Sequence, residues 1–252
     1  MAVKPVLLIR ASGNENDQLA LKEVGIESRI DPYLKIAPAK DSDGAFELLA
    51  ELNSTNESAW VIATSANSLR YWAQIVGAEK LRSEFSTERK IRFAAIGSKT
   101  AQLFREYGAQ EVLQPNLATG KSLLDKLLQM PKARAIMPIG NLTLGFVQEG
   151  LIAGGWSVNA LIVYTHESVA TRPESVNALE KGEFAAVILR SPSAVRAFLQ
   201  FVPSPKLPLI CGGMSAALEL EKAGLRAAAI FDNPEPTALA ELTQRIVRGG
   251  SQ

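Results

Sequence analysis

Short apolar runs alternate with amphipathic stretches of helical spacing from one end of the chain to the other. This alternation is typical of parallel α/β folds, in which each buried strand is followed by a helix. Because about ten strands would strain one twisted sheet, the pattern predicts two sheets of about five strands each. The runs that predict strands are Val6–Ile9, Ser28–Tyr33, Trp60–Ala63, Arg92–Ile96, Glu111–Leu113, Arg134–Pro138, Ser157–Tyr164, Ala186–Leu189, Pro208–Cys211 and Ala227–Phe231.

The sequence also resembles itself between its two halves, and the first matching pair has an offset of 126 residues, half of the 252. Val61–Arg70 resembles Val187–Arg196, and Ala95–Leu103 resembles Ile210–Leu218. A third, looser pair lies at the start of each half. Any two βα units share such features, but the preserved order of three units favours an internal duplication.

Polar residues and glycines gather where a predicted strand ends and a helix begins. The carboxyl ends of parallel strands form the ligand crevice of such sheets, and free N–H groups at helix starts bind anions there. Ser and Thr are also favoured helix N-caps, so capping alone can explain any single position. The set as a whole favours a binding edge, because neighbouring glycines let a ligand reach the backbone. Its members are Thr64-Ser65, Gly97–Thr100, Thr119-Gly120, Ser191–Ser193, Gly212–Ser215 and Thr237.

Composition narrows the classes of partner and chemistry. The formal charge is +1, which does not indicate a nucleic-acid or anionic-membrane surface. Apolar stretches such as Ala160–Tyr164 are too short to span a bilayer, and the first ten residues lack a signal-peptide pattern, so we expect a soluble cytoplasmic protein. A single histidine, His166, and a single cysteine, Cys211, exclude an internal disulfide and most metal sites. We therefore expect no metal and no cofactor.

Two nucleotide-binding motifs are incomplete. Gly120-Lys121-Ser122 would end a P-loop, but that motif needs a glycine where Pro115 stands. The segment Arg10–Glu15 after the first strand lacks the Gly-x-Gly-x-x-Gly fingerprint of dinucleotide-binding enzymes. Nucleotide-dependent chemistry is therefore not indicated.

Several short motifs follow one another along the chain. They are a strand ending in Arg10, a helix closing at Val24-Gly25, then Asp31–Pro38, Ala63–Ser68, Ala95–Ala101, Val163–Thr165, Leu189–Val195 and Pro234–Leu239. In this order they resemble the uroporphyrinogen-III synthase family over essentially the whole chain. Two positions depart from the family pattern: Leu144 stands where an arginine is usual, and Gly212–Ala216 replaces a Gly-x-x-Thr-Ala motif.

The resemblance implies an architecture that the repeat alone would not give, since the repeat suggests a cut near residue 126. It implies an α/β protein of two flavodoxin-like lobes, each a parallel sheet flanked by helices, joined by a two-stranded linker. One lobe would combine residues 1–36 with 168–252, and the other would comprise 39–163. The linkers would lie near 35–38 and 163–168, with the strand ends of the lobes facing each other across a cleft.

The resemblance also implies an activity. Such enzymes cyclise hydroxymethylbilane, a linear tetrapyrrole, to uroporphyrinogen III with inversion of the terminal pyrrole and loss of water, which makes them lyases. We expect a cytoplasmic monomer without nucleic-acid or membrane partners. The protein would mainly fold the substrate and neutralise its carboxylates. The alternative is a non-enzymatic two-lobed protein that binds a small molecule.

Tyr164 matches the linker tyrosine of the family and is the candidate catalytic acid. An ordinary phenol remains protonated at neutral pH and can donate to the departing hydroxyl. Tyr164 could instead only pack the linker, and His166 could share the role. The candidate substrate-binding residues are Arg10, Thr64, Ser65, Gly97, Lys99, Thr100, Thr119, Gly120, Lys121, Ser191, Ser193, Gly212, Gly213 and Ser215.

Overall fold

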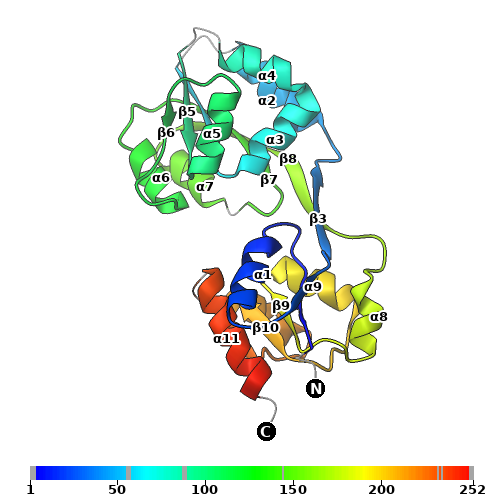
Figure 1. The fold of residues 1–252 in the computed structure, drawn as a ribbon. Helices are drawn as coiled ribbons and strands as arrows, with labels where there is room; N and C mark the ends of the chain where they lie inside the picture. The colour runs from blue at the N-terminus through cyan, green and yellow to red at the C-terminus, as the bar shows by residue number, and fades with distance from the viewer. Residues whose placement is uncertain are drawn as a thin grey trace. The chain divides into compact units, whose positions relative to one another are not determined.

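A computed structural model describes residues 4–54, 58–86, 90–143, 145–231, 233 and 235–249. Within these residues the chain forms eleven strands and eleven helices. It divides into two compact units (Figure 1). Unit 1 combines the chain up to Lys35 with the chain from Glu167 onward, and unit 2 is Ile36–His166. The positions of Leu144 and Pro234, which the sequence motifs include, lie outside the described residues.

Unit 1 contains a five-stranded parallel sheet in the order β11-β10-β9-β1-β2. Numbered along the chain, this order is 2-1-3-4-5, which is that of flavodoxin-like folds. The strands are β1 (Val6–Leu8), β2 (Ser28–Ile30), β9 (Ala186–Leu189), β10 (Leu209–Gly212) and β11 (Ala229–Phe231). The helices are α1 (Asn14–Glu23), α8 (Ser175–Glu180), α9 (Pro192–Phe201), α10 (Met214–Lys222) and α11 (Pro236–Gly249).

Both faces of this sheet are buried at its centre, which explains why β1 and β9 are continuous apolar runs, whereas the edge strand β2 carries the exposed Arg29. Leu7 and Ile9 pack with α8, α9 and α10 on one face. Val6 and Leu8 point to the other face, where they pack with α1 and α11. The alternation of side chains along a strand thus divides the apolar residues of unit 1 between two cores.

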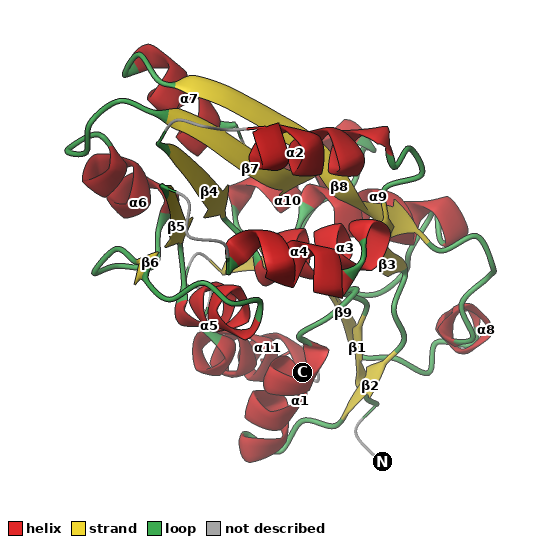
Figure 2. Cartoon of the chain, turned by 90° about the horizontal axis from the view of Figure 1, so that it is seen from above, coloured by secondary structure: helices red, strands yellow, loops and turns green. Residues whose placement is uncertain are grey.

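Unit 2 contains a six-stranded sheet in the order β3-β8-β7-β4-β5-β6. The two longest strands, β7 and β8, pair in parallel and lie side by side (Figure 2). The strands are β3 (Leu34–Pro38), β4 (Ala59–Ala63), β5 (Ile91–Ala95), β6 (Val112–Leu113), β7 (Arg134–Gly140) and β8 (Ser157–Ser168). The helices are α2 (Asp43–Ser54), α3 (Ala66–Val76), α4 (Ala78–Phe85), α5 (Ser98–Glu106), α6 (Gly120–Leu127) and α7 (Phe146–Ala153).

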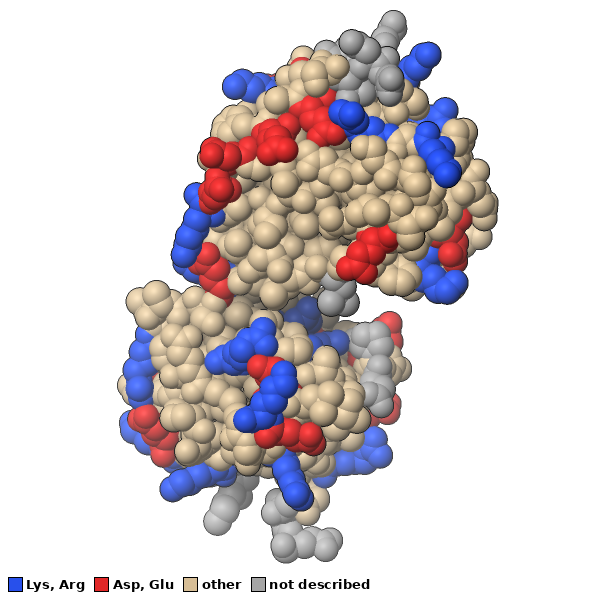
Figure 3. All heavy atoms as spheres, turned by 180° about the vertical axis from the view of Figure 1, so that it is seen from behind, with Lys and Arg blue, Asp and Glu red and all other residues tan. Residues whose placement is uncertain are grey.

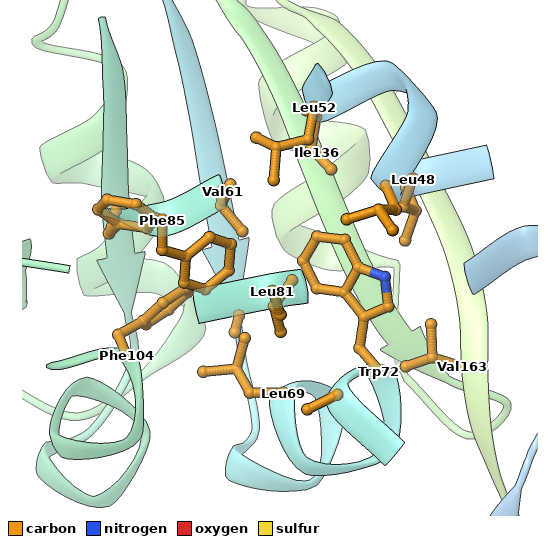
Figure 4. Packing of buried hydrophobic residues seen from close by; sticks show 14 of the residues in the cluster. Leu48, Leu52, Val61, Leu69, Trp72, Leu81, Phe85, Phe104, Ile136 and Val163 are labelled. Atoms are coloured by element: carbon orange, nitrogen blue, oxygen red, sulfur yellow. The ribbon is translucent and has the colours of Figure 1, made fainter. Parts of the chain in front are cut away.

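The larger core of unit 2 lies between the sheet and helices α2 to α5. Trp72 of α3 is fully buried there and points toward Leu48 and Ile136 (Figure 4). Its indole N–H donates to the carbonyl of Ala45 at 2.8 Å, so the buried ring leaves no unsatisfied donor. A second core, with α6 and α7, covers the opposite face of the sheet.

The structure confirms an α/β fold with two sheets and differs from the sequence prediction in three details. Leu34–Pro38 forms strand β3, which is not among the strands predicted from the apolar runs. Strand β8 continues to Ser168, past the predicted end at Tyr164. The expected linker segments fall within β3 and β8, which are neighbours in the sheet of unit 2.

The third difference is the strand order of unit 2. Counted along the chain, β4 to β8 have the order 3-2-1-4-5, the other common arrangement of doubly wound sheets. The flavodoxin-like order is therefore found in unit 1 alone. A hydrophobic pattern predicts strands but not their neighbours, so the sequence could not distinguish the two orders.

Positively and negatively charged side chains are interspersed on the surface. Both signs occur on each unit in the view of Figure 3, as the formal charge of +1 suggests. No helix among the described residues is long and apolar enough to cross a membrane.

Candidate active site

Each sheet has one point where the strand order reverses. In unit 1 this switch point lies between β1 and β9, and in unit 2 it lies between β4 and β7. Ligands of open α/β sheets bind in the crevice outside the carboxyl ends of the strands at such points. The sequence candidates Arg10, Ser65 and Ser191 each lie just beyond the carboxyl end of one of these strands, β1, β4 and β9 respectively. Both carboxyl edges therefore carry candidate residues at the switch point.

Tyr164 lies at the carboxyl edge of unit 2, on β8 beside the end of β7. Its side chain is 5% exposed, and its ring stacks on that of Tyr71 with 5.7 Å between centroids. The ring also covers Gly140, where an added Cβ would come within 2.4 Å of the Tyr164 Cζ. Only a glycine fits at that position. The hydroxyl of Tyr71 donates to the carbonyl of Ile36 at 2.9 Å, which fixes the Tyr71 ring beneath its partner in the stack.

The orientation of Tyr164 depends on an irregularity in β8. Ile139 pairs with Ile162, but Gly140 pairs with Tyr164, so Val163 is an extra residue in the strand. Val163 and Tyr164 are consecutive, yet both pack into the core beneath α2 to α5. Regular strands place consecutive side chains on opposite faces, and a bulge is the usual way to redirect one of them. The Tyr164 hydroxyl has no hydrogen-bond partner within the part of the chain that the structure describes.

Asn141 joins the ends of β7 and β8 around this tyrosine. Its backbone N–H donates to the Tyr164 carbonyl at 3.1 Å. Its side-chain Oδ1 accepts from the His166 backbone N–H at 2.9 Å, and its Nδ2 donates to the His166 carbonyl at 3.3 Å. Because all three bonds involve backbone atoms of β8, Asn141 holds the strand in place whatever the side chain at residue 166.

The imidazole of His166 lies 5.5 Å from the Tyr164 ring, in an edge-to-face arrangement. Burial lowers the pKa of His166, since the charged imidazolium loses hydration. Its Nδ1 atom is buried without a hydrogen-bond partner among the described residues. The neutral ring is thus the form that this environment favours.

The rest of the edge of unit 2 consists of helix starts. Ser65 caps α3, its hydroxyl accepting from the Asn67 N–H at 3.2 Å. Gly97 precedes α5, and an added Cβ there would meet no atom within 4 Å, so the backbone is open to a ligand. Thr100 is buried and Lys99 is exposed. Because β8, β7, β4 and β5 are successive neighbours, these residues share one edge with Tyr164.

The candidates Thr119, Gly120 and Lys121 are less well placed. They begin α6, which follows the edge strand β6 at the far side of the sheet from β8. Thr119 caps the helix, accepting from the Ser122 N–H at 3.1 Å. The Lys121 ammonium pairs with Asp125 of the same helix at 3.0 Å. Capping and a surface ion pair account for these residues without a ligand.

At the carboxyl edge of unit 1 the chain turns back on itself after β1. The Arg10 backbone N–H donates to Asn14 Oδ1 at 3.1 Å, and Asn14 Nδ2 donates to the Arg10 carbonyl at 2.8 Å. On the neighbouring strand, Ser191 caps α9 by accepting from the Ala194 N–H at 3.2 Å, and its Oγ lies 2.9 Å from that of Ser193. Arg10 and the two serines thus lie on either side of the switch point.

Beyond β9, the loop after β10 completes this edge. A Cβ on Gly212 would approach the Arg190 Cα within 2.8 Å, so the glycine allows the two strand ends to come together. Gly213 has a φ of 88°, a conformation that glycine adopts without strain, and it begins α10. Ser215 is exposed in the first turn of that helix.

The match to a known family is extensive. The model of the HEM4 family, described as Uroporphyrinogen-III synthase HemD, matches residues 17–241. This chain belongs to the uroporphyrinogen-III synthase family. The family match favours an enzyme of heme biosynthesis over a two-lobed binding protein without activity.

Solved structures of uroporphyrinogen-III synthases share the fold. A synthetase from Helicobacter pylori is 15% identical, with a TM-score of 0.63 over 96% of this chain and 99% of that one. A mutant synthase from Thermus thermophilus is 17% identical, with a TM-score of 0.55 over 97% of this chain and 99% of that one. No curated protein matches the chain significantly.

Several residues of these edges escaped the sequence prediction. Arg190 was recognisable only as the residue between a buried strand and the Ser191 cap. Asn141 and Tyr71 gave no signal, because each acts through a partner distant in sequence. Asp17 lies in a polar helix start, Asn14–Gln18, where nothing distinguishes a buried carboxylate from a solvated one.

Two further features bear on the chemistry available to a uroporphyrinogen-III synthase. Among the described residues, no group of three His, Cys, Asp or Glu side chains could hold a metal. Cys211 is fully buried in β10, and burial raises its thiol pKa to about 11, so it remains an uncharged core residue.

Proposed function

We propose that this member of the uroporphyrinogen-III synthase family converts hydroxymethylbilane to uroporphyrinogen III, acting as a lyase. The observation that carries the proposal is the family match over residues 17–241. The arrangement of Tyr164 and the helix starts supports roles for individual residues.

The reaction begins when the terminal C–O bond of the substrate breaks. A proton supplied to the oxygen releases water and leaves a protonated, electrophilic azafulvene. The distal pyrrole attacks at its substituted carbon and forms a spiro intermediate, which reopens and recloses with that ring inverted. The free pyrrole carbon loses a proton at the final closure, so the net change is the loss of one water.

Tyr164 is the proposed donor to the departing hydroxyl. Stacking on Tyr71 and contact with Gly140 fix the ring, while the hydroxyl is not used by the described residues of the protein. A fixed donor at the reacting oxygen lowers the barrier to C–O cleavage. The rest of the catalytic effect comes from folding the substrate so that its two ends meet.

The substrate carboxylates are the proposed ligands of the helix starts. The N–H groups at the beginning of α3, α5, α9 and α10 provide partial positive charge at the carboxyl edges. Arg10 and Lys99 add full charges at these two edges. A nearly neutral protein can bind a polycarboxylate in this way without a lysine-rich surface.

The test is to supply the purified protein with enzymatically generated hydroxymethylbilane and identify the porphyrin isomer after oxidation. We expect uroporphyrinogen III in excess of the type I isomer that forms spontaneously. Formation of type I alone would refute the proposal. Tight binding of the tetrapyrrole without turnover would instead support the alternative of a non-enzymatic binding protein. We further propose that the active species is a cytoplasmic monomer that requires no cofactor.

A further inference from the structure

A buried carboxylate lies between two arginines at the switch point of unit 1. Asp17 of α1 is 1% exposed. Its Oδ1 accepts from Arg190 Nη1 at 2.6 Å, and its Oδ2 lies 3.7 Å from Arg10 Nη1. Arg10 is the second residue after β1, and Arg190 directly follows β9, so the carboxylate bridges the ends of the strands on either side of the reversal.

The two arginines differ in how firmly they are held. The Arg190 side chain is 13% exposed, and its guanidinium lies 5.1 Å from the Phe231 ring centroid in a cation–π arrangement. The Arg10 side chain is 39% exposed, and its distance to Asp17 exceeds that of a direct hydrogen bond. The turn at Gly13 has a φ of 77°, and a Cβ added at this glycine would lie 3.5 Å from Arg10 Nη1, so the turn leaves room for the guanidinium. Arg10 is thus oriented by Asp17, while its side chain remains partly exposed to a ligand.

Two guanidinium groups so close together would repel each other without a counter-charge. Burial, followed by the charge of Arg190, lowers the pKa of Arg10, while Asp17 acts in the opposite direction. The three groups together carry a net charge of +1. One carboxylate of a ligand would neutralise that charge.

We infer that Asp17 is a positioning residue that holds Arg10 at the carboxyl edge of unit 1, where Arg10 binds one carboxylate of the substrate. Asp17 does not touch the substrate and acts through Arg10. The inference rests on the proposed function, because it takes the ligand to be the carboxylated tetrapyrrole.

A double-mutant cycle on Asp17→Asn and Arg10→Gln tests this role, with KM and kcat measured for type III formation. We expect Arg10→Gln to raise KM about tenfold with little change in kcat, since the lost contact is made to substrate and transition state alike. Asp17→Asn should raise KM similarly in the wild-type background and have almost no further effect in the Arg10→Gln background. Arg10→Lys should recover only part of the loss, because an ammonium lacks the guanidinium's planar fork.

Glu219→Gln is the matched control. Glu219 is also a carboxylate of unit 1 between two cations, accepting from Arg196 Nη1 at 2.9 Å and Lys222 Nζ at 3.0 Å, but it lies near the end of α10. We expect its KM to equal that of the wild type. Thermal unfolding of each variant separates loss of fold from loss of binding.

The outcomes distinguish this inference from the proposed function. If the wild-type protein forms no type III isomer, the proposed function fails. If the wild type is active and the KM of Arg10→Gln equals that of the wild type, the inference is overturned. This holds whether or not Asp17→Asn folds. It is also overturned if the effects of Asp17→Asn and Arg10→Gln on KM are additive, because Asp17 would then act independently of Arg10.

Discussion

Tyr164 owes its direction to one extra residue, Val163. Without the bulge, Tyr164 would point to the opposite face of the sheet from Val163, away from Tyr71 and Gly140. Sequence could identify the tyrosine by its motif, but it could not predict the bulge, which depends on the register between β7 and β8. The motif thus identified Tyr164 as a candidate, while its surroundings could not be predicted.

We expect Tyr164→Phe to lower kcat by about 10- to 100-fold. This decrease in kcat is at the low end of the range for loss of a general acid, because the pyrrole nitrogen itself helps to expel the hydroxyl. The ring contacts with Tyr71 and Gly140 survive the substitution, so thermal stability and product binding should change little. Wild-type turnover of Tyr164→Phe in steady-state kinetics would show that this residue only packs.

His166 should make the stability of the protein depend on pH. Above about pH 6.5 the imidazole is neutral in both the folded and the unfolded chain and contributes nothing. As the pH falls below that value, the unfolded chain takes up a proton before the folded chain does, because burial lowers the folded-state pKa. The free energy of unfolding therefore decreases on acidification.

Thermal unfolding at about pH 7.5 and about pH 5.5, on either side of the ordinary histidine pKa, measures this effect. We expect His166→Gln to lose less stability between the two values than the wild type does. The substitution retains the bonds of Asn141, which go to the backbone of residue 166. An identical loss in both proteins would contradict the role assigned to His166.

At the scale of elements, the apolar runs predicted where strands lie but not which strands adjoin. Ten of the eleven strands among the described residues were recognisable as short runs rich in apolar residues. The signal is clearest in β1, β4 and β9, which are buried along their whole length. Leu34–Pro38 was not recognisable, because its alternating residues are typical of an edge strand or an extended connection alike. Polar residues at the strand ends indicated the candidate binding edges as a group. They did not identify the individual members, because helix capping explains Thr119 and an ion pair explains Lys121.

The capped helices give a prediction of their own. Ser65→Ala and Ser191→Ala each remove a side chain that accepts from the first turn of a helix. Each should lower the free energy of unfolding by about 1 kcal/mol. We expect KM to change only slightly, because the backbone N–H groups that bind carboxylates remain.

Ser215→Ala is the comparison for these variants. Ser215 is exposed, and α10 is preceded by Gly213 and has no side-chain cap. Chemical denaturation should therefore give the wild-type midpoint. A severe loss of activity in any of the three would mean that a hydroxyl, rather than the backbone, contacts the substrate.

At the scale of the molecule, the two units have separate cores. Trp72 belongs to a core within unit 2, and Phe198 belongs to one within unit 1. We expect Trp72→Ala and Phe198→Ala each to cost about 3–5 kcal/mol. Because the cores are separate, hydrogen exchange should accelerate only in the unit that carries the substitution.

Hydrogen exchange followed by mass spectrometry resolves the two units directly. Peptides from Ile36–His166 should respond to Trp72→Ala, and peptides from the remainder of the chain should respond to Phe198→Ala. An equal response of all peptides to either variant would mean that the molecule unfolds as one body.

Unit 1 is made from both ends of the chain, as the blue and red segments of Figure 1 show. Helix α11 closes on α1, where the Gln244 side chain donates to the Val24 carbonyl at 2.6 Å. The ribosome therefore synthesises all of Ile36–His166 before it makes β9, the strand that pairs with β1 in unit 1. During synthesis, the apolar residues of β1 and α1 that pack against α11 therefore remain exposed until α11 has been made. A premature stop codon that removed α11 alone would leave exposed the apolar residues that pack against α11, although most of the protein had already been synthesised.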